Sequence, residues 1–400
     1  MERASWPIAA MLFLAACGRS GPAMPGVSLP AAQDHAGRWE VGLGKVLSTK
    51  NGGQIFGFAI DQNGDDGVLA SSRATRKSFV SNVSVETFDQ DSGKITKSFA
   101  LHVGRRDQYT VDGIFDNDIA LVTHGITPKG RLLGFVRYEV MNPVTGQKFT
   151  GAWSPPEKDT GVFETAENQS TPTAALFGLE LKNQDQPDLI VSNIAAKTSR
   201  VFHLDPNLFE LGDGPQLAQY TAANEAIFAL SPDGGARKVP PVAPLNVLID
   251  LKTGRETQFA GLDEGPYGSG LVNGLAVDSS TGVAATTTEF NAEVEFYNLK
   301  TNTPITAVQL PCTGSASQEN SGSGIANDPI NHLFLVSEYA YCDGDHGSAI
   351  TVYDESGNFI ETITGFAFGL GESAAALNPS KRMGWALGGD GFTELQQFFY

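Results

Sequence analysis

A short apolar phrase that ends in Asp or Asn recurs at a fixed interval in the second half of the chain. It reads Leu275-Ala276-Val277-Asp278, then Ile325-Ala326-Asn327-Asp328, then Ala375-Ala376-Leu377-Asn378, so its last residue returns every 50 positions. Self-similarity at such a period is the signature of repeat architectures, in which each unit is one small supersecondary element. This interval constrains the fold more than any other feature of the sequence.

Looser copies of the phrase end at positions 61, 116, 181 and 231, which brings the count to seven units. Each unit continues through short strand-like segments separated by Gly, Asp and Asn turns, as in the four-stranded blade of a propeller. The last unit stops after Phe392–Tyr400, one strand short, while the segment Arg38–Leu47 has strand-like alternation and no unit of its own. We predict an all-β, seven-bladed β-propeller of four-stranded antiparallel blades, with the ring closed by the N-terminal strand.

Two stretches interrupt this regular pattern. Residues 153–172 are rich in polar residues and proline, and we expect a long loop there. Residues 212–224 are expected to form a short helix or a loop. The expected propeller domain as a whole covers residues 38–400.

The N-terminus has the pattern of an export signal. Arg3 precedes an apolar run from Ile8 to Leu14, which ends in small residues. The sequence Leu14-Ala15-Ala16-Cys17-Gly18 resembles the bacterial lipobox, which implies that residues 1–16 are removed and that Cys17 is lipidated. An ordinary cleaved signal with an incidental Cys is the alternative. Residues 17–37, rich in Gly, Pro and Ala, would then be a flexible tether, and the expected location is the bacterial cell envelope, with the lipid in the membrane.

Charge and cysteine content narrow the possible partners. The chain has 27 basic and 45 acidic residues, a formal net charge of −18, which repels the phosphates of nucleic acids. Besides Cys17, only Cys312 and Cys342 are present, and in an exported protein we expect them to form a disulfide. Two buried thiols or a metal pair are the alternatives. We expect a monomer.

One unit carries a family resemblance. The run Ser323–Pro329, followed by Leu333–Ser337 and Ala349–Gly357, resembles an NHL or YVTN propeller repeat. The resemblance implies a fold and leaves the activity open, because these families include binding scaffolds as well as lactonases.

Polar residues just before each phrase are the first candidates for a site. In propellers, the loops that enter the innermost strands gather at one mouth of the central channel. The candidate channel-mouth residues are Asp112, Glu225, Asn273 and Glu372. Carboxylates and amides are ligands suited to calcium. The run Asn273–Ala276 is also similar to a channel motif of gluconolactonase-like propellers, which implies a catalytic divalent metal, although the full ligand set is not matched. Ordered water and strand capping are the alternative roles.

A second possible calcium site lies in the turn Asp61–Gly67. Its residues Asp61, Asn63 and Asp65 approach the DxNxDG loop, but one extra Asp displaces the Gly and the later carboxylate is missing. A solvated hairpin is the simpler reading. Apart from His346, the histidines are His35, His102, His124, His203 and His332. They lie far from one another in the sequence, so no histidine cluster with metal-ligand spacing is expected.

The sequence therefore predicts an envelope-anchored binding scaffold. It does not identify the ligand, for which an envelope protein and a small molecule are the two candidates. The alternative is a calcium-dependent lactonase or esterase that uses the channel mouth. No P-loop, GxSxG elbow or dinucleotide fingerprint points to another chemistry.

Overall fold

The structure of the protein is a computed structural model. The structure describes residues 41–49, 52–72, 83–101, 107–115, 119–126, 135–141, 160–168, 173–180, 186–193, 196, 198–206, 209, 215–230, 245–260, 272–288, 293–311, 322–341, 347–367, 370, 375–388 and 392–400.

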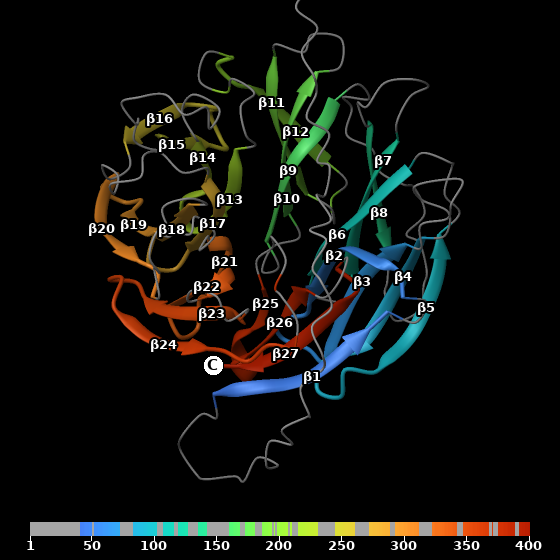
Figure 1. Cartoon of the computed structure of the whole chain (residues 1–400). Helices are drawn as coiled ribbons and strands as arrows, with labels where there is room; N and C mark the ends of the chain where they lie inside the picture. The colour runs from blue at the N-terminus through green and yellow to red at the C-terminus, as the bar shows by residue number, and fades with distance from the viewer. Residues whose placement is uncertain are drawn as a thin grey trace, which may run out of the picture.

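Small antiparallel sheets stand around a common centre (Figure 1). The first two sheets hold β2 (Gln54–Ile60), β3 (Asp66–Ser72), β4 (Val83–Asp89) and β5 (Ile95–Leu101), then β6 (Asp107–Phe115), β7 (Ile119–Ile126) and β8 (Phe135–Met141). The next two hold β9 (Thr160–Asn168), β10 (Thr173–Glu180), β11 (Pro187–Asn193) and β12 (Thr198–His203), then β13 (Gln216–Tyr220), β14 (Glu225–Leu230), β15 (Leu245–Asp250) and β16 (Glu256–Ala260).

The C-terminal half repeats this arrangement three times. Its sheets hold β17 (Val272–Asp278), β18 (Val283–Thr288), β19 (Glu293–Asn298) and β20 (Thr303–Gln309), then β21 (Gly322–Asp328), β22 (Leu333–Tyr341), β23 (Gly347–Asp354) and β24 (Phe359–Ile363), and finally β25 (Ala376–Asn378), β26 (Met383–Gly388), β27 (Glu394–Phe399) and β1 (Gly42–Ser48). The described part of the chain contains no helix with the length and hydropathy that crossing a bilayer requires.

The first strand of each sheet lies at the centre of the ring. β13 contacts β9 and β17, β17 contacts β21, and β25 contacts both β21 and β2, so the last sheet meets the first. The predicted role of the N-terminal strand is confirmed, because β1 pairs with β27 in antiparallel register, with Gly42 opposite Phe399 and Leu47 opposite Leu395. The first and last strands of the described residues therefore belong to the same sheet.

The prediction of seven four-stranded blades is wrong. The described residues form six four-stranded blades, and the remaining sheet, β6-β7-β8, has three strands. After β8, the next described strand is β9, which pairs with β10 rather than with β8. The intervening residues 142–159 lie outside the described residues. The recurring phrase marks one strand of a repeat and does not report how many strands follow it. The prediction assigned four strands to every repeat, whereas the described residues of the repeat that begins with β6 form three.

Two innermost strands also lie where no strand was expected. β9 falls inside the predicted loop of residues 153–172, and β13 falls inside the predicted helix or loop of residues 212–224. The phrases assigned to the third and fourth units belong instead to β10 and β14, the second strands of their sheets. Second strands are covered on both faces, so β14 is almost entirely buried and reads as a continuous apolar run. This run resembles the apolar phrase that marks the other innermost strands.

The core consists of apolar layers between successive sheets. One layer joins the sheets of β17 and β21 through Phe296, Phe334 and Val336, all fully buried. Another joins the last sheet to the first through Leu47, Phe88 and Trp385, whose ring lies edge-on to Phe88 at a centroid distance of 5.2 Å. Burial falls toward the outer strands, as in β20, which has no buried residue. The packing holds neighbouring sheets together and leaves the ends of the strands to carry polar contacts.

Candidate functional site

The recurring Asp of the phrase connects one sheet to the next. Asp278 ends β17 and its side chain is fully buried. Its Oδ1 accepts hydrogen bonds from the backbone N–H of Ser280 at 2.9 Å and from the Ser280 hydroxyl at 2.6 Å. Its Oδ2 lies 2.8 Å from Nδ1 of His332, which belongs to the next sheet. One carboxylate thus shapes its own turn with one oxygen and holds the neighbouring sheet with the other.

A second carboxylate completes this cluster. Glu355, in the turn between β23 and β24, places Oε1 3.7 Å from Nδ1 of His332. The Thr281 hydroxyl donates to the same Oε1. The side chain of His332 is 49 % exposed and that of Glu355 is 23 % exposed, whereas that of Asp278 is fully buried. The cluster therefore opens to solvent on its histidine side.

The charges in the cluster depend on one another. Burial would raise the pKa of Asp278, but hydrogen bonds from Ser280 and His332 hold it below its usual value. The hydrogen bond to Asp278 raises the pKa of His332. Burial and the adjacent Asp278 carboxylate raise the pKa of Glu355. Two carboxyl groups therefore lie beside one imidazole ring, and this arrangement favours a positive charge on His332 or on an ion bound beside it.

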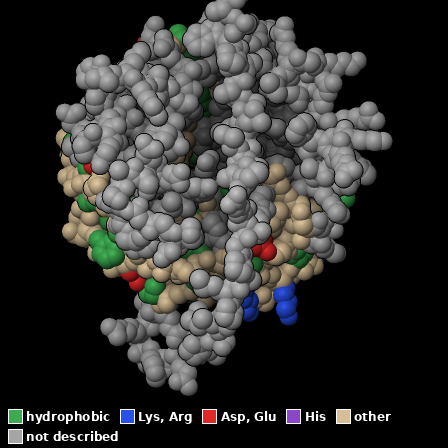
Figure 2. Space-filling view, in the orientation of Figure 1, with side chains coloured by type: hydrophobic (Ala, Val, Ile, Leu, Met, Phe, Trp, Pro, Cys, Tyr) green, Lys and Arg blue, Asp and Glu red, His purple; other side chains and the backbone are tan. Residues whose placement is uncertain are grey.

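Three exposed apolar side chains lie in the segments that carry the cluster or pack against it. Ile330, two residues before His332, is 59 % exposed, and Phe359, four residues after Glu355, is 56 % exposed. The turn of Glu355 packs against β20, because a Cβ at Gly357 would lie 2.5 Å from Cγ2 of Thr306. The neighbour of Thr306, Ile305, is 41 % exposed. We call Ile305, Ile330, His332, Glu355 and Phe359 the junction surface. In Figure 2, separate hydrophobic side chains lie among other atoms along the lower left rim, where Figure 1 places β24.

The next junction uses the same position of the repeat. Asp328, at the end of β21, is fully buried, and its Oδ1 accepts from the backbone N–H groups of Ile330 and Asn331, each at 2.9 Å. Its Oδ2 accepts from the Tyr400 hydroxyl at 3.0 Å, across to the last sheet. The repeated Asp is therefore a structural link between sheets.

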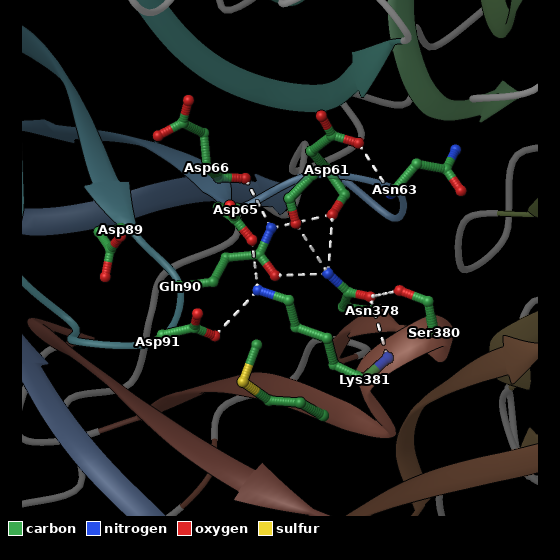
Figure 3. Close-up of polar contacts among 12 residues, drawn as sticks. Asp61, Asn63, Asp65, Asp66, Asp89, Gln90, Asp91, Asn378, Ser380 and Lys381 are labelled. Carbon is green, nitrogen blue, oxygen red and sulfur yellow. Dashed lines mark hydrogen bonds and ion pairs between the residues drawn. The ribbon is translucent and has the colours of Figure 1, made fainter.

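The closing junction is drawn in Figure 3. Asn378 donates from Nδ2 to the backbone oxygens of Asp61 and Gly64 and to Oε1 of Gln90. Lys381 bridges two carboxylates of the first sheet, Asp65 at 2.6 Å and Asp91 at 2.9 Å (Figure 3).

The residues of the predicted calcium loop take part in this junction. The Asp65 carboxylate pairs with Lys381, and Asp61 Oδ1 accepts from the backbone N–H of Asn63 at 2.9 Å. The turn that was expected to wrap an ion thus contacts the last sheet through Lys381 and Asn378. Calcium binding at Asp61, Asn63 and Asp65 stays a prediction.

Two predicted channel residues occupy the same structural position. Asn273 is half-buried and lies at a bulge in β17, where the register shifts between Val272 and Gly274. Asp112 lies at the corresponding bulge in β6, between Val111 and Gly113. A bulge re-aims a side chain of the innermost strand, which makes these positions comparable across sheets.

The other predicted residues lie apart from these two. Glu225 begins β14, opposite Tyr220 at the end of β13, where burial and the nearby Asp250 raise its pKa. Because β14 is a second strand, Glu225 lies at the end where β13 finishes, whereas Asn273 lies near the start of β17. Glu372, Cys17, Cys312 and Cys342 lie outside the described residues. The calcium-dependent hydrolase stays a prediction.

The cluster of Asp278, His332 and Glu355 was not predicted, since His332 has no ligand-like spacing in the sequence. A signal was nevertheless present. Four residues after the repeated Asp or Asn, the backbone has positive φ: 77° at Gly282, 57° at His332 and 45° at Arg382. Gly is the residue that adopts such angles most readily. A His at this position of the repeat is conspicuous once the repeat is aligned.

Comparison with known proteins identifies the fold. No protein-family profile matches the sequence, and no curated protein matches it. Solved structures do match. The WD40 repeats of RRP9 share 12 % identity at a TM-score of 0.60, over 90 % of this chain and 99 % of that one. The chain is a β-propeller.

Two further propellers are similar. The WD40 domain of Pan2 from Neurospora crassa has 10 % identity and a TM-score of 0.55, over 87 % of this chain and 90 % of that one. The β-propeller domain of Cps50 (Swd1) from Myceliophteria thermophila has 11 % identity and a TM-score of 0.56, over 90 % and 100 % of the two chains. At these identities the likeness concerns the fold and not the ligand.

Proposed function

We propose that the protein is a binding scaffold and that a partner protein docks on the junction surface. The observation that carries this proposal is the exposure of Ile305, Ile330 and Phe359 in segments that carry or adjoin the half-exposed His332. Protein interfaces contain apolar side chains together with polar ones, which is the combination found on this surface. The WD40-type propellers that share the fold are typically interaction scaffolds, which supports a protein as the partner.

The rigidity of this region suits a scaffold. The junction surface takes Ile305 from β20 and its other residues from the sheet of β21–β24, and Asp278 ties these two sheets together through His332. A surface that is already ordered loses little conformational entropy when it binds. We therefore assign recognition to this surface and structural support to the sheets below it.

Affinity purification tests the proposal. The tagged chain would be compared with the double variant Ile330→Ser and Phe359→Ser, after chemical cross-linking and identification of the bound proteins. Val46→Ser is the matched control, because Val46 is 42 % exposed on β1, in a different sheet. We expect a partner that the wild type and Val46→Ser retain and the double variant loses. Equal recovery with all three chains contradicts docking on this surface.

We further propose that the scaffold is anchored in the bacterial cell envelope through a lipid on Cys17. The lipobox-like sequence Leu14–Gly18 supports this location. The variant Cys17→Ala is expected to move from the membrane fraction to the soluble fraction, whereas Cys312→Ala is expected to stay with the membrane. If Cys17→Ala remains in the membrane fraction, the lipid-anchor proposal is wrong, and the docking proposal is unaffected.

A further inference from the structure

We propose that Asp278, His332 and Glu355 form a binding site for one divalent cation of the zinc type. Their ligand atoms, one imidazole nitrogen and two carboxylate oxygens, all lie within 4.8 Å of one another. The described residues contain no other group of three such atoms. This inference is independent of the docking proposal, since a cation could bind here whether or not a protein covers the surface.

The distances fit a small tetrahedral ion. Zinc lies about 2.0–2.2 Å from nitrogen and oxygen ligands, which places neighbouring ligands of a tetrahedron about 3.3 Å apart. Nδ1 of His332 lies 2.8 Å from Asp278 Oδ2 and 3.7 Å from Glu355 Oε1, so the two distances bracket that value. Shifts of about half an ångström would bring both of these separations to that value, and the two carboxylate oxygens lie within 4.8 Å of each other.

The donor set favours zinc over calcium. Calcium takes six to eight oxygen ligands, whereas imidazole nitrogen is a preferred ligand of zinc. Three protein ligands leave one position of a tetrahedron for water, and the half-exposed face of His332 gives solvent and ions access to it. On binding, the cation takes the place of the proton that Nδ1 shares with the two carboxylates, and Nε2 keeps the ring proton.

The surroundings hold the ligands in position. Asp278 is fixed by two hydrogen bonds from Ser280, and Glu355 accepts the Thr281 hydroxyl. Such outer contacts orient metal ligands and limit what the ion must reorganise. The three ligands come from two sheets, so a bound cation would also strengthen this junction.

A second histidine supplies the matched control. His203 Nδ1 lies 2.8 Å from Oδ1 of the buried Asp188, the same distance as in the His332 pair, and His203 is 63 % exposed. This pair belongs to no group of three ligand atoms in the described part of the chain. His203→Ala therefore removes an equivalent ion pair without touching the proposed site.

Isothermal titration of the chelator-treated full chain with zinc chloride tests the site. We expect the wild type and His203→Ala to bind one zinc ion that His332→Ala does not bind. Glu355→Gln keeps the hydrogen bond between Asp278 and His332, and it is expected to weaken that binding more than about tenfold. Circular dichroism would verify that each variant is folded.

Two results overturn the proposal. One is an unchanged zinc stoichiometry and affinity in both His332→Ala and Glu355→Gln. The other is displacement of the zinc by an equal concentration of calcium, which would reduce the cluster to a nonselective acidic surface. Because the readout is zinc alone, failure here is separate from failure to find a protein partner.

Discussion

Nδ2 of Asn378 donates a hydrogen bond to Oε1 of Gln90 at 2.9 Å, although 288 positions separate the two residues in the sequence. Both side chains are fully buried. Gln90 in turn donates to the backbone oxygens of Asp61 at 2.9 Å and Asp66 at 2.7 Å. Asn378 of the last sheet and Gln90, which follows β4 of the first sheet, therefore together satisfy backbone oxygens of the first sheet. A buried network of this kind is sensitive to the loss of any member.

Removing the Asn378 amide should weaken the ring at its closing junction. Asn378→Ala leaves Gln90 Oε1 and the Gly64 oxygen without their donor, and unsatisfied buried groups are costly. We expect the free energy of unfolding to fall by about 2–4 kcal/mol, measured by urea denaturation.

Asn358→Ala provides the comparison. Asn358 also donates through Nδ2 to an Asp, at 2.9 Å from Asp354, but in an exposed turn. We expect it to cost less than about 1 kcal/mol. Equal losses for the two variants would mean that the closing network adds nothing beyond an ordinary turn.

The closure of the ring could be predicted because two short segments of the sequence indicate it. The segment that contains β1 alternates and has no unit of its own, while the last unit is one strand short. The strand assignments were less secure. β13 has the sequence QLAQY, with two Gln residues and no terminal Asp, so nothing in it marks an innermost strand. Its role follows from its contacts with β9 and β17, which depend on residues far away in the chain.

The N-terminal strand should contribute measurable stability. Leu47 is 2 % exposed and packs with Trp385 and Leu395, so Leu47→Ala leaves a cavity between the last sheet and the first. We expect a loss of about 2–4 kcal/mol in the free energy of unfolding, followed by thermal or urea denaturation. The adjacent Val46 is 42 % exposed, and Val46→Ala should change stability by less than about 0.5 kcal/mol. Comparable effects from the two would contradict a packed closing strand.

Close packing of two innermost strands requires Gly274. A Cβ at this position would lie 2.9 Å from the backbone nitrogen of Ile325 and 3.1 Å from Cα of Gly324. Backbone atoms cannot move aside as the end of a side chain can, so Gly274→Ala should push β17 away from β21. We expect a loss of about 1–3 kcal/mol, measured by the shift in the urea midpoint.

Gly42→Ala in β1 is the control, because a Cβ there would meet nothing within 4 Å. It should leave the urea midpoint nearly unchanged. If Gly274→Ala is equally harmless, the two central strands are not packed as closely as described.

The cluster of Asp278, His332 and Glu355 could not be predicted from the sequence alone. Asp278 was recognisable as a turn residue of the repeat, but its partner His332 lies 54 positions away and belongs to the following sheet. To pair them, one must know which turns of neighbouring sheets lie side by side, and only the three-dimensional arrangement of the sheets shows this. By contrast, Asn273 and Asp112 were selected for preceding the phrase, and they do share a bulge position.

The buried carboxyl of Glu338 should make stability depend on pH. Its side chain is fully buried in β22, where Oε1 accepts the Thr351 hydroxyl and Oε2 has no hydrogen-bond partner among the described residues. Burial raises the pKa of Glu338 from 4.5 to about 7. The folded state therefore keeps this proton between pH 4.5 and 7, whereas the unfolded chain releases it. The stabilisation is complete below pH 4.5 and is lost as the pH rises through 7.

Glu338→Gln removes this titration. The difference in free energy of unfolding between the variant and the wild type should grow in favour of Gln by about 3 kcal/mol from pH 4.5 to pH 8. Urea denaturation at several pH values measures it, and taking the difference cancels the other titrating groups. Glu394→Gln is the control, because Glu394 accepts a hydrogen bond from the Ser48 hydroxyl in an exposed contact. A difference that stays constant with pH would show that Glu338 ionises in the folded protein as it does in the unfolded chain.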